Sequence, residues 1–229
     1  MPQETDTTSH RYIHADMGPE MPEDPSQRVN WVVSTDDPVE KKRRYDVWAK
    51  HYEQDLLVND GYQAPDKALD AMLRFVPQAA RILDAGCGTG YVGKLLHDAG
   101  YRNLVGGDYA EGMLEVAAQK GVYDTLDQID LSTALPYEDN SFDCVVTVGI
   151  PMIVPGTCMN EFARIVKPGG KIVYSSGEAQ FTRAGFDTVV AALTAEDKLD
   201  ELIDPEPYQA FLHVNTDVMF AVRVYEVTG

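Results

Sequence analysis

The feature that most constrains the fold is an apolar run that leads into three closely spaced glycines. The order is Ile82-Leu83-Asp84-Ala85, then Gly86-Cys87-Gly88-Thr89-Gly90, then an amphipathic stretch. A loop between a strand and a helix lies at the carboxyl end of the strand, where parallel sheets bind ligands. Glycines allow close backbone approach, and the N–H groups of the following helix can receive an anion. The segment therefore predicts a site for a nucleotide-like ligand.

Short apolar runs alternate with amphipathic helices around this loop, which is typical of a parallel sheet with helical crossovers. The predicted strands are Arg81–Ala85, Asn103–Gly107, Thr125–Ile129, Phe142–Val148 and Lys171–Ser176. A helix around Asp187–Leu202 should precede a closing hairpin of Tyr208–Val214 and Val218–Val227, joined by residues 215–217. The prediction is an α/β, Rossmann-like three-layer sandwich. Its mostly parallel seven-stranded sheet carries a C-terminal antiparallel hairpin and N-terminal capping helices.

The N-terminal part divides into a polar tail and a helical segment. Residues 1–28 hold four prolines among acidic and polar residues, so we expect a flexible acidic tail, with residues 29–229 forming the domain. The alternative is a lid over the site, to which Tyr12, Ile13 and Trp31 contribute. From Val39 onward, apolar residues recur at helical spacing, and a second helix follows Pro65.

Charge and cysteine content narrow the range of partners. The formal net charge of −18 disfavours nucleic acid and anionic membranes and favours small, neutral or cationic substrates. The three cysteines lack metal-ligand spacing and are interpreted as reduced structural thiols, and we expect no metal site. With neither a signal peptide nor a membrane-spanning run in view, we expect a cytoplasmic monomer or homodimer.

Two carboxylates follow predicted strands at positions suited to a nucleoside. Asp108 ends the second strand, where it can accept bonds from ribose hydroxyls; its alternative role is a helix cap. Asp130, with Leu131, ends the third strand, where an adenine edge can bind; its alternative is a surface turn. The glycine spacing differs from the dinucleotide pattern, because the third glycine comes one residue early and Tyr91 takes its place. A nicotinamide-dependent oxidoreductase is therefore less favoured.

Five segments together resemble the class I S-adenosylmethionine-dependent methyltransferases. They are Leu83 to Gly90, Val105 to Asp108 followed by Met113-Leu114, Asp130 before Leu135-Pro136, Ser141-Phe142-Asp143, and Val166 to Gly170. The helical segment from Tyr45 to Tyr52, with Tyr62 and Pro65, further resembles the methyltransferase-like proteins of the Williams–Beuren syndrome region.

The resemblance implies S-adenosylmethionine as cofactor and assigns its contacts. The loop residues Asp84, Gly86, Cys87, Gly88 and Gly90 correspond to the motif around the methionine part. Asp108 corresponds to the ribose acid, Tyr109 and Met113 flank adenine, and Asp130 with Leu131 meets its edge. Val148 and Gly149 lie beside the sulfonium, and Tyr45 and Tyr52 cover the cofactor. After Gly149 the sequence Ile150-Pro151-Met152 lacks the Asn-Pro-Pro-Tyr or Asp-Pro-Pro-Tyr motif of many enzymes that methylate nucleobases or glutamine.

The implied reaction is in-line displacement onto a small-molecule N, O or S nucleophile, which needs positioning and exclusion of water. A hydroxyl acceptor would gain from a base, for which His51 and His213 are the candidates. The acceptor pocket should combine the helical segment with residues 150–157 and 177–186, including Met152, Glu178 and Phe181. The alternative function is a catalytically silent cofactor-binding protein that acts through a partner.

The basic run from Lys41 to Arg44 allows a targeting or nucleic-acid interpretation. It adjoins a helix with an apolar face, so a solvated helix start is preferred.

Overall fold

The computed structural model of the chain describes residues 17–150, 154–203, 205–214 and 217–229. The α-helices are α1 (Arg28–Val33), α2 (Pro38–Trp48), α3 (Ala64–Phe75), α4 (Tyr91–Asp98), α5 (Glu111–Ala118), α6 (Cys158–Ile165), α7 (Glu178–Arg183) and α8 (Phe186–Ala195). Two short helices complete them, the 3-10 helix η1 (Pro25–Gln27) and the π-helix η2 (Gln54–Asn59). The strands are β1 (Arg81–Ala85), β2 (Asn103–Asp108), β3 (Thr125–Gln128), β4 (Phe142–Val148), β5 (Val166–Gly177), β6 (Leu199–Glu201), β7 (Tyr208–Gln209) and β8 (Met219–Val227).

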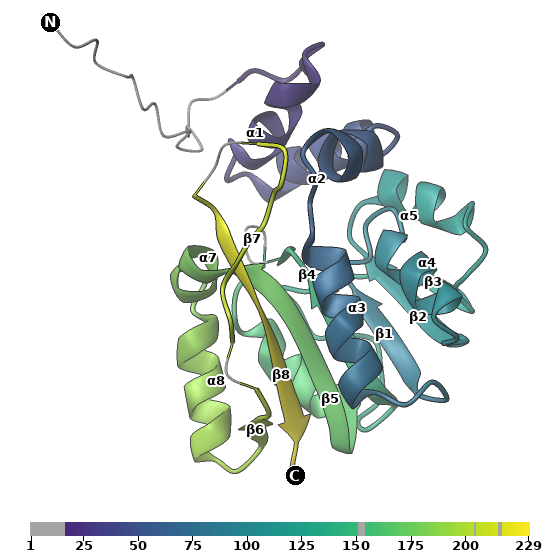
Figure 1. The fold of residues 1–229 in the computed structure, drawn as a ribbon, viewed down its shortest axis with the longest axis vertical. Coiled ribbons are helices and arrows are strands. Elements are labelled where there is room, and N and C mark those ends of the chain that lie inside the picture. Colours follow the sequence, from purple (N-terminus) through teal and green to yellow (C-terminus); the bar gives the residue numbers. More distant parts are fainter. Residues whose placement is uncertain (1–16, 151–153, 204, 215–216) are drawn as a thin grey trace, which may run out of the picture.

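The strands form one mixed sheet in the order β3-β2-β1-β4-β5-β8-β6 (Figure 1). β1 to β5 are parallel to their neighbours, whereas β8 runs antiparallel to β5. β6 and β7 both pair antiparallel with β8, at its opposite ends. This arrangement confirms the predicted Rossmann-like α/β fold with an antiparallel C-terminal part.

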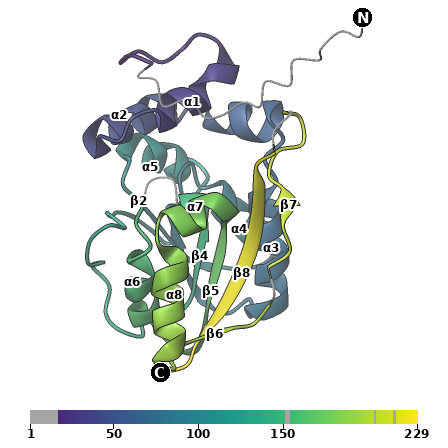
Figure 2. The same cartoon turned by 90° about the vertical axis from the view of Figure 1, so that its left-hand side faces the viewer.

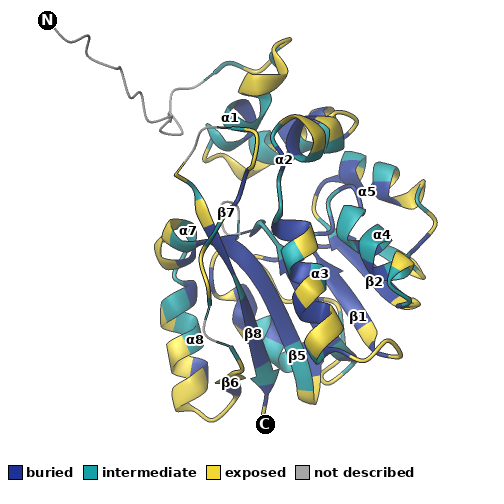
Figure 3. Cartoon of the chain, in the orientation of Figure 1, coloured by how far each residue is buried: buried dark blue, intermediate teal, exposed yellow. Residues whose placement is uncertain are grey.

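Helices cover both faces of the sheet and bury two separate apolar cores. On one face α3 and α4 pack through residues such as Met72 and Leu96. On the other face α6, α7 and α8 pack through Phe162, Phe181 and Phe186. Figures 2 and 3 show the result, a buried sheet between helices whose outer surfaces are exposed.

The N-terminal helices close the end of the sheet where the strands β1, β2 and β4 finish (Figure 2). Asp37 caps α2 by accepting the Val39 N–H at 2.9 Å, and Pro38 occupies its first turn. Trp31 and Trp48 are buried there in a cluster that also contains residues of β8 and the segment before it. The capping helices are thus part of the packed domain.

The predicted tail is described only from Met17 onward. Within this part, Gly18 accepts the Trp31 indole N–H at 2.9 Å, and Pro22 accepts the Arg28 guanidinium at 3.0 Å. Residues 17–28 therefore contact the helices that follow. Residues 1–16, with the proposed lid residues Tyr12 and Ile13, lie outside the described residues.

Several predicted bounds differ from the structure, and among the strands β5 begins at Val166 instead of Lys171. The helix predicted to reach Leu202 ends at Ala195, because Asp197 takes a positive φ of 55° and the chain enters β6. The first hairpin strand is only two residues long, since Phe211 instead forms a bridge with Tyr62. The first helical segment divides into α2 and η2. The hairpin residues Asn215 and Thr216 lie outside the described part.

Within the described ranges, no helix has the length and apolar character needed to cross a bilayer. All three cysteines are buried free thiols.

Candidate functional site

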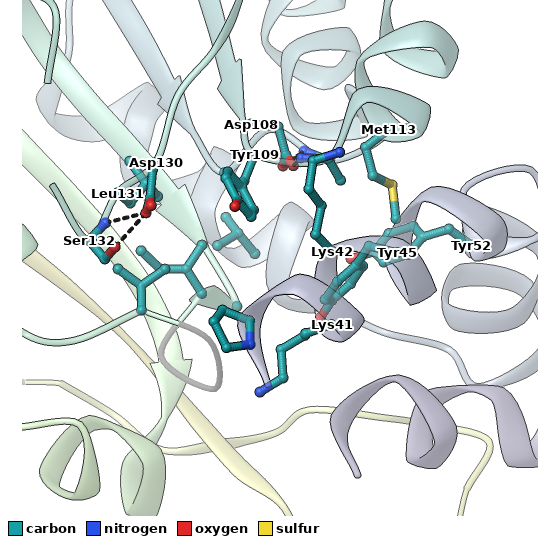
Figure 4. A pocket seen from close by; sticks show the side chains of 18 residues that line it. Lys41, Lys42, Tyr45, Tyr52, Asp108, Tyr109, Met113, Asp130, Leu131 and Ser132 are labelled. Carbon is teal, nitrogen blue, oxygen red and sulfur yellow. Dashed lines mark hydrogen bonds between the residues drawn. The ribbon is translucent and has the colours of Figure 1, made fainter. Parts of the chain in front are cut away.

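The site lies where the chain changes direction within the sheet. β1 sits between β2 and β4, and the crossover through α4 leads to β2 while the one through α6 leads from β4 to β5 on the other side. Such a switch point leaves a crevice at the carboxyl ends of the two central strands. A cavity of about 280 Å³ opens there, beneath α2 (Figure 4). The described residues that line it are Pro38, Lys41, Lys42, Tyr45, Tyr52, Gly86, Gly88, Asp108, Tyr109, Ala110, Met113, Asp130, Leu131, Ser132, Val148, Gly149, Ile150 and Val154.

The glycine loop after β1 forms the floor of the cavity. Gly86 and Cys87 both donate their N–H to the Gly107 carbonyl, at 2.8 and 3.0 Å, which ties the loop to β2. Gly86 has φ of +75°, and a Cβ there would lie 2.6 Å from Ile150 Cγ2. A Cβ on Gly88, at φ of +52°, would meet no atom within 4 Å. Gly88 therefore faces open space, which lets a ligand approach the backbone closely.

Asp108 ends β2 and turns its carboxylate toward the loop. It accepts the Gly88 N–H at 2.8 Å and the Ala110 N–H at 2.9 Å. Burial raises the pKa of this carboxyl, while the two N–H bonds lower it. Each carboxylate oxygen can accept a further hydrogen bond. The residue thus holds the turn before α5 and also borders the cavity.

Asp130 and Leu131 follow β3 and line the next part of the wall. Asp130 Oδ1 accepts the backbone N–H of Ser132 at 2.8 Å and its hydroxyl at 2.6 Å (Figure 4). Asp130 therefore closes a turn, as its alternative interpretation predicted, and it also lines the cavity. Tyr109, 41% exposed, and buried Met113 complete this end.

Two tyrosines reach the cavity from the N-terminal helices. Tyr45 lies on α2, and Tyr52 lies just before η2. Burial raises the pKa of both phenols, and the nearby Asp108 carboxyl raises it further. Their hydroxyls accordingly stay protonated at neutral pH and can donate hydrogen bonds.

Asp84, Cys87 and Gly90 belong to the loop motif but are not among the described residues that line the cavity. Asp84 lies beneath the loop and accepts the Tyr123 hydroxyl at 2.6 Å. Burial raises the pKa of Asp84 to about 7, although the bond from Tyr123 opposes this shift. A Cβ on Gly90 would lie 3.0 Å from Ala117 and Tyr123, so this glycine permits helix packing. These three residues support the loop from below.

The two histidines proposed as bases are not brought to the cavity. His51 is exposed on the turn after α2, and His213 is exposed with its Nδ1 3.2 Å from the Val58 carbonyl. Neither is among the described lining residues. They were selected by residue type alone, and the geometry gives no support to a catalytic role.

The predicted acceptor segment contributes less than expected. Ile150 and Val154 line the cavity, whereas Met152 lies outside the described residues. Phe181 packs against Tyr174 and Phe186 with ring centroids 5.7 and 5.6 Å apart, and Glu178 pairs with Arg223 at 2.9 Å. Phe181 and Glu178 therefore have structural partners. Among the residues that the structure describes, no group of three or more His, Cys, Asp or Glu could hold a metal ion.

Sequence reasoning placed the helical segment at the site through Tyr45 but did not single out the other α2 residues that line the cavity, Pro38, Lys41 and Lys42. Pro38, Lys41 and Tyr45 are three and four residues apart, which places them on one helix face, and all line the cavity. Tyr45 was predicted to cover the ligand, and Lys41 lies four residues before it on the same helix face. This spacing could have predicted Lys41 from the sequence.

Comparison with known proteins identifies the domain. Residues 83–174, from β1 to β5, match the family model for a methyltransferase domain. This part contains the glycine loop and all the lining residues between Gly86 and Val154. The central part of the chain, residues 83–174, therefore matches a methyltransferase domain, and S-adenosylmethionine is the methyl donor that this match implies.

Two curated relatives extend the similarity beyond this core. Methyltransferase-like protein 27 of Homo sapiens is 36% identical over 151 residues, which are 63% of this chain and 61% of that protein. Demethylmenaquinone methyltransferase of Clavibacter sepedonicus is 35% identical over 122 residues, 49% of each protein. The chain thus spans between about half and three fifths of the length of these relatives.

Solved structures share the fold. The TehB-like S-adenosylmethionine-dependent methyltransferase of Corynebacterium glutamicum superposes with a TM-score of 0.58 at 21% identity, covering 81% of this chain and 99% of that one. The 4+2 cyclase SpnF gives a TM-score of 0.65 at 17% identity, covering 82% and 95%. At these identities the likeness establishes the fold.

Proposed function

We propose that this protein transfers a methyl group from S-adenosylmethionine to a small-molecule acceptor by in-line displacement. The observation that carries the proposal is the convergence of five separate chain segments on one cavity at the switch point of the sheet. These segments are α2 and the turn after it, the loop after β1, the end of β2, the turn after β3 and the end of β4.

The lining residues suit the parts of S-adenosylmethionine. Asp108 would accept the ribose hydroxyls, because each of its oxygens retains a free acceptor site. Asp130 Oδ2 would accept the adenine amine, since only Oδ1 is engaged by Ser132. Tyr109 and Met113 offer flanking surfaces for the base, and the open backbone at Gly88 gives room for the methionine part.

When bound, S-adenosylmethionine supplies a methyl group that its sulfonium has already activated. The task of the chain is then to position the acceptor and to exclude water. α2 and the tyrosines Tyr45 and Tyr52 cover the cavity, and Val148, Gly149 and Ile150 form its wall at the end of β4. His51 and His213 do not line the cavity, so the proposal assigns neither of them as a base.

Further aspects of the function follow from the same site. We propose a small molecule as acceptor, rather than nucleic acid or a membrane lipid, because the cavity of about 280 Å³ lies beneath α2 and the chain is strongly acidic. A cytoplasmic monomer or homodimer remains part of the proposal. We also assign the chain to the narrower methyltransferase-like group that its N-terminal helical segment resembles. Support comes from Tyr45 and Tyr52 of that segment, which both line the cavity.

The test is transfer of label from isotopically methyl-labelled S-adenosylmethionine into a small-molecule extract, followed by mass spectrometry. The proposal expects labelled low-molecular-weight products with the native protein and far fewer with Asp108→Ala. Label found only in macromolecules, or in no product although the donor binds, would contradict it.

A further inference from the structure

Lys41 stands out among the residues that line the cavity. It lies in the first half of α2, on the face that also carries Pro38 and Tyr45, and its side chain is half-buried. Within the described part of the chain, no carboxylate lies within 4.0 Å of its ammonium and no hydrogen bond engages it. Figure 4 shows the ammonium pointing away from Asp108 and Asp130.

The other basic residues of the same run are all paired. Lys42 contacts Asp46 at 3.1 Å, while Arg43 and Arg44 contact Glu40 at 2.7 and 2.8 Å. Each of these three charges has a carboxylate partner within α2, and the two arginines share Glu40. Within this run, Lys41 is the residue that both lines the cavity and has no carboxylate partner among the described residues.

The surroundings of Lys41 make this arrangement costly without a ligand. Burial lowers the pKa of the Lys41 ammonium, Asp36 raises it, and the second cation Arg183 lowers it. Asp36 offsets only part of the hydration that this half-buried charge loses, because the pKa of Lys41 is lowered on balance. An anion placed beside Lys41 would restore the missing interaction.

Part of the cavity lining is apolar. Pro38, Ile150 and Val154 line the same cavity as Lys41. A ligand that satisfies both features has an apolar or aromatic body and one anionic group.

We propose that Lys41 binds an anionic group of the methyl acceptor, so that the substrate class is small apolar or aromatic carboxylates and related anions. This inference rests on the proposed function. It reverses the expectation of neutral or cationic substrates drawn from the net charge of −18. Net charge sets the long-range potential, which salt screens over about 8–10 Å, whereas Lys41 acts at contact distance within the cavity.

The carboxylate of the donor is a second source of the same chemistry, and the experiment separates the two. Protein saturated with S-adenosylhomocysteine is titrated calorimetrically with benzoate and with the neutral benzamide. Benzoate should bind at least about tenfold more tightly, as expected for a charge-assisted hydrogen bond. Lys41→Met should abolish this preference and leave the affinity for S-adenosylhomocysteine unchanged, while Lys41→Arg should retain the preference.

Lys50→Met is the matched control, because Lys50 is exposed just beyond α2 and is not among the described lining residues. It removes the same charge and should leave both titrations unchanged, with unfolding temperatures confirming that each variant is folded. Equal binding of the two probes to the native protein, no benzoate binding, or a preference that survives in Lys41→Met would overturn the inference. A loss of S-adenosylhomocysteine affinity in Lys41→Met would overturn it by assigning the ammonium to the donor. Failure of native protein to bind S-adenosylhomocysteine would instead contradict the proposed function itself.

Discussion

The Asp108 carboxylate accepts the backbone N–H of Gly88 at 2.8 Å and so joins the end of β2 to the glycine loop after β1. The end of β2 and the glycine loop both border the cavity, and this hydrogen bond fixes their relative position. One residue therefore shapes the loop and offers the remaining acceptor sites of its oxygens to a ligand.

Asp108→Ala should weaken S-adenosylhomocysteine binding about 10- to 100-fold. The reason is the loss of charge-assisted hydrogen bonds of about 1.5–3 kcal/mol. Calorimetric titration measures the change, and Asp98→Ala, an exposed substitution in α4, serves as the control. Unchanged affinity in a folded Asp108→Ala protein would refute the ribose assignment.

Gly88→Ala should impair ligand binding more than stability. The left-handed backbone makes the substitution cost about 1–2 kcal/mol, and the added methyl group would occupy the cavity. Gly121→Ala is a matched control, because Gly121 has φ of +62°, is exposed, and a Cβ there also meets no atom within 4 Å. Both variants should lose similar free energy of unfolding in denaturant titrations. Only Gly88→Ala should lose S-adenosylhomocysteine affinity, and equal affinities in the two variants would contradict the position of the loop at the ligand.

Asp84 should make stability depend on pH. Its folded pKa, raised by burial to about 7, lies above the ordinary value of 3.8, so the folded state favours the protonated carboxyl. The stability that the folded state gains by favouring the protonated Asp84 carboxyl is fully present below about pH 4. It is lost as the pH rises through about 7, and the free energy of unfolding falls by on the order of 4 kcal/mol in total.

The comparison with Asp84→Asn isolates this contribution, since the amide cannot ionise and can still accept the Tyr123 hydroxyl. Denaturant titrations at about pH 5 and about pH 8 should show the native protein losing stability relative to the variant at the higher pH. A difference between the two proteins that stays constant with pH would show that Asp84 does not titrate in this range.

Asp55 should anchor the N-terminal helices. Its buried carboxylate accepts the Trp48 indole N–H at 2.8 Å and pairs with Arg28 at 3.1 Å. Asp55→Ala leaves the Trp48 N–H unsatisfied and removes the carboxylate partner of Arg28, and it should lower the free energy of unfolding by about 3 kcal/mol. Removal of the exposed Lys94 pair by Asp98→Ala should lower the free energy of unfolding much less, because solvent screens an exposed ion pair. Similar losses in the two variants, measured by denaturant titration, would argue against this anchor.

The central strands were predictable because their signals are local. β1 and β4 have the predicted bounds, since each is a short apolar run bounded by polar or glycine residues. β6 was not predictable, because its three residues become a strand only by pairing with β8, far away in the sequence. The length of β7 likewise depends on the bridge between Tyr62 and Phe211.

The same contrast between local sequence signals and tertiary packing holds for the candidate site. Asp108 and Gly88 were found because they sit at fixed places relative to predicted strands, and both line the cavity. Lys41 was missed because a run of four basic residues favours a solvated helix start, and only tertiary packing shows that Lys41 and Lys42 lie partly buried at the cavity. His51 and His213 had no positional signal, and they lie elsewhere.

The central claim is that this cavity binds an adenosyl sulfonium donor, and calorimetric titration of the native protein with S-adenosylhomocysteine and with NADH tests it most directly. The account predicts one-site binding of S-adenosylhomocysteine, weakened by Asp108→Ala, and no binding of NADH. Binding of NADH alone, or of neither compound, would contradict it.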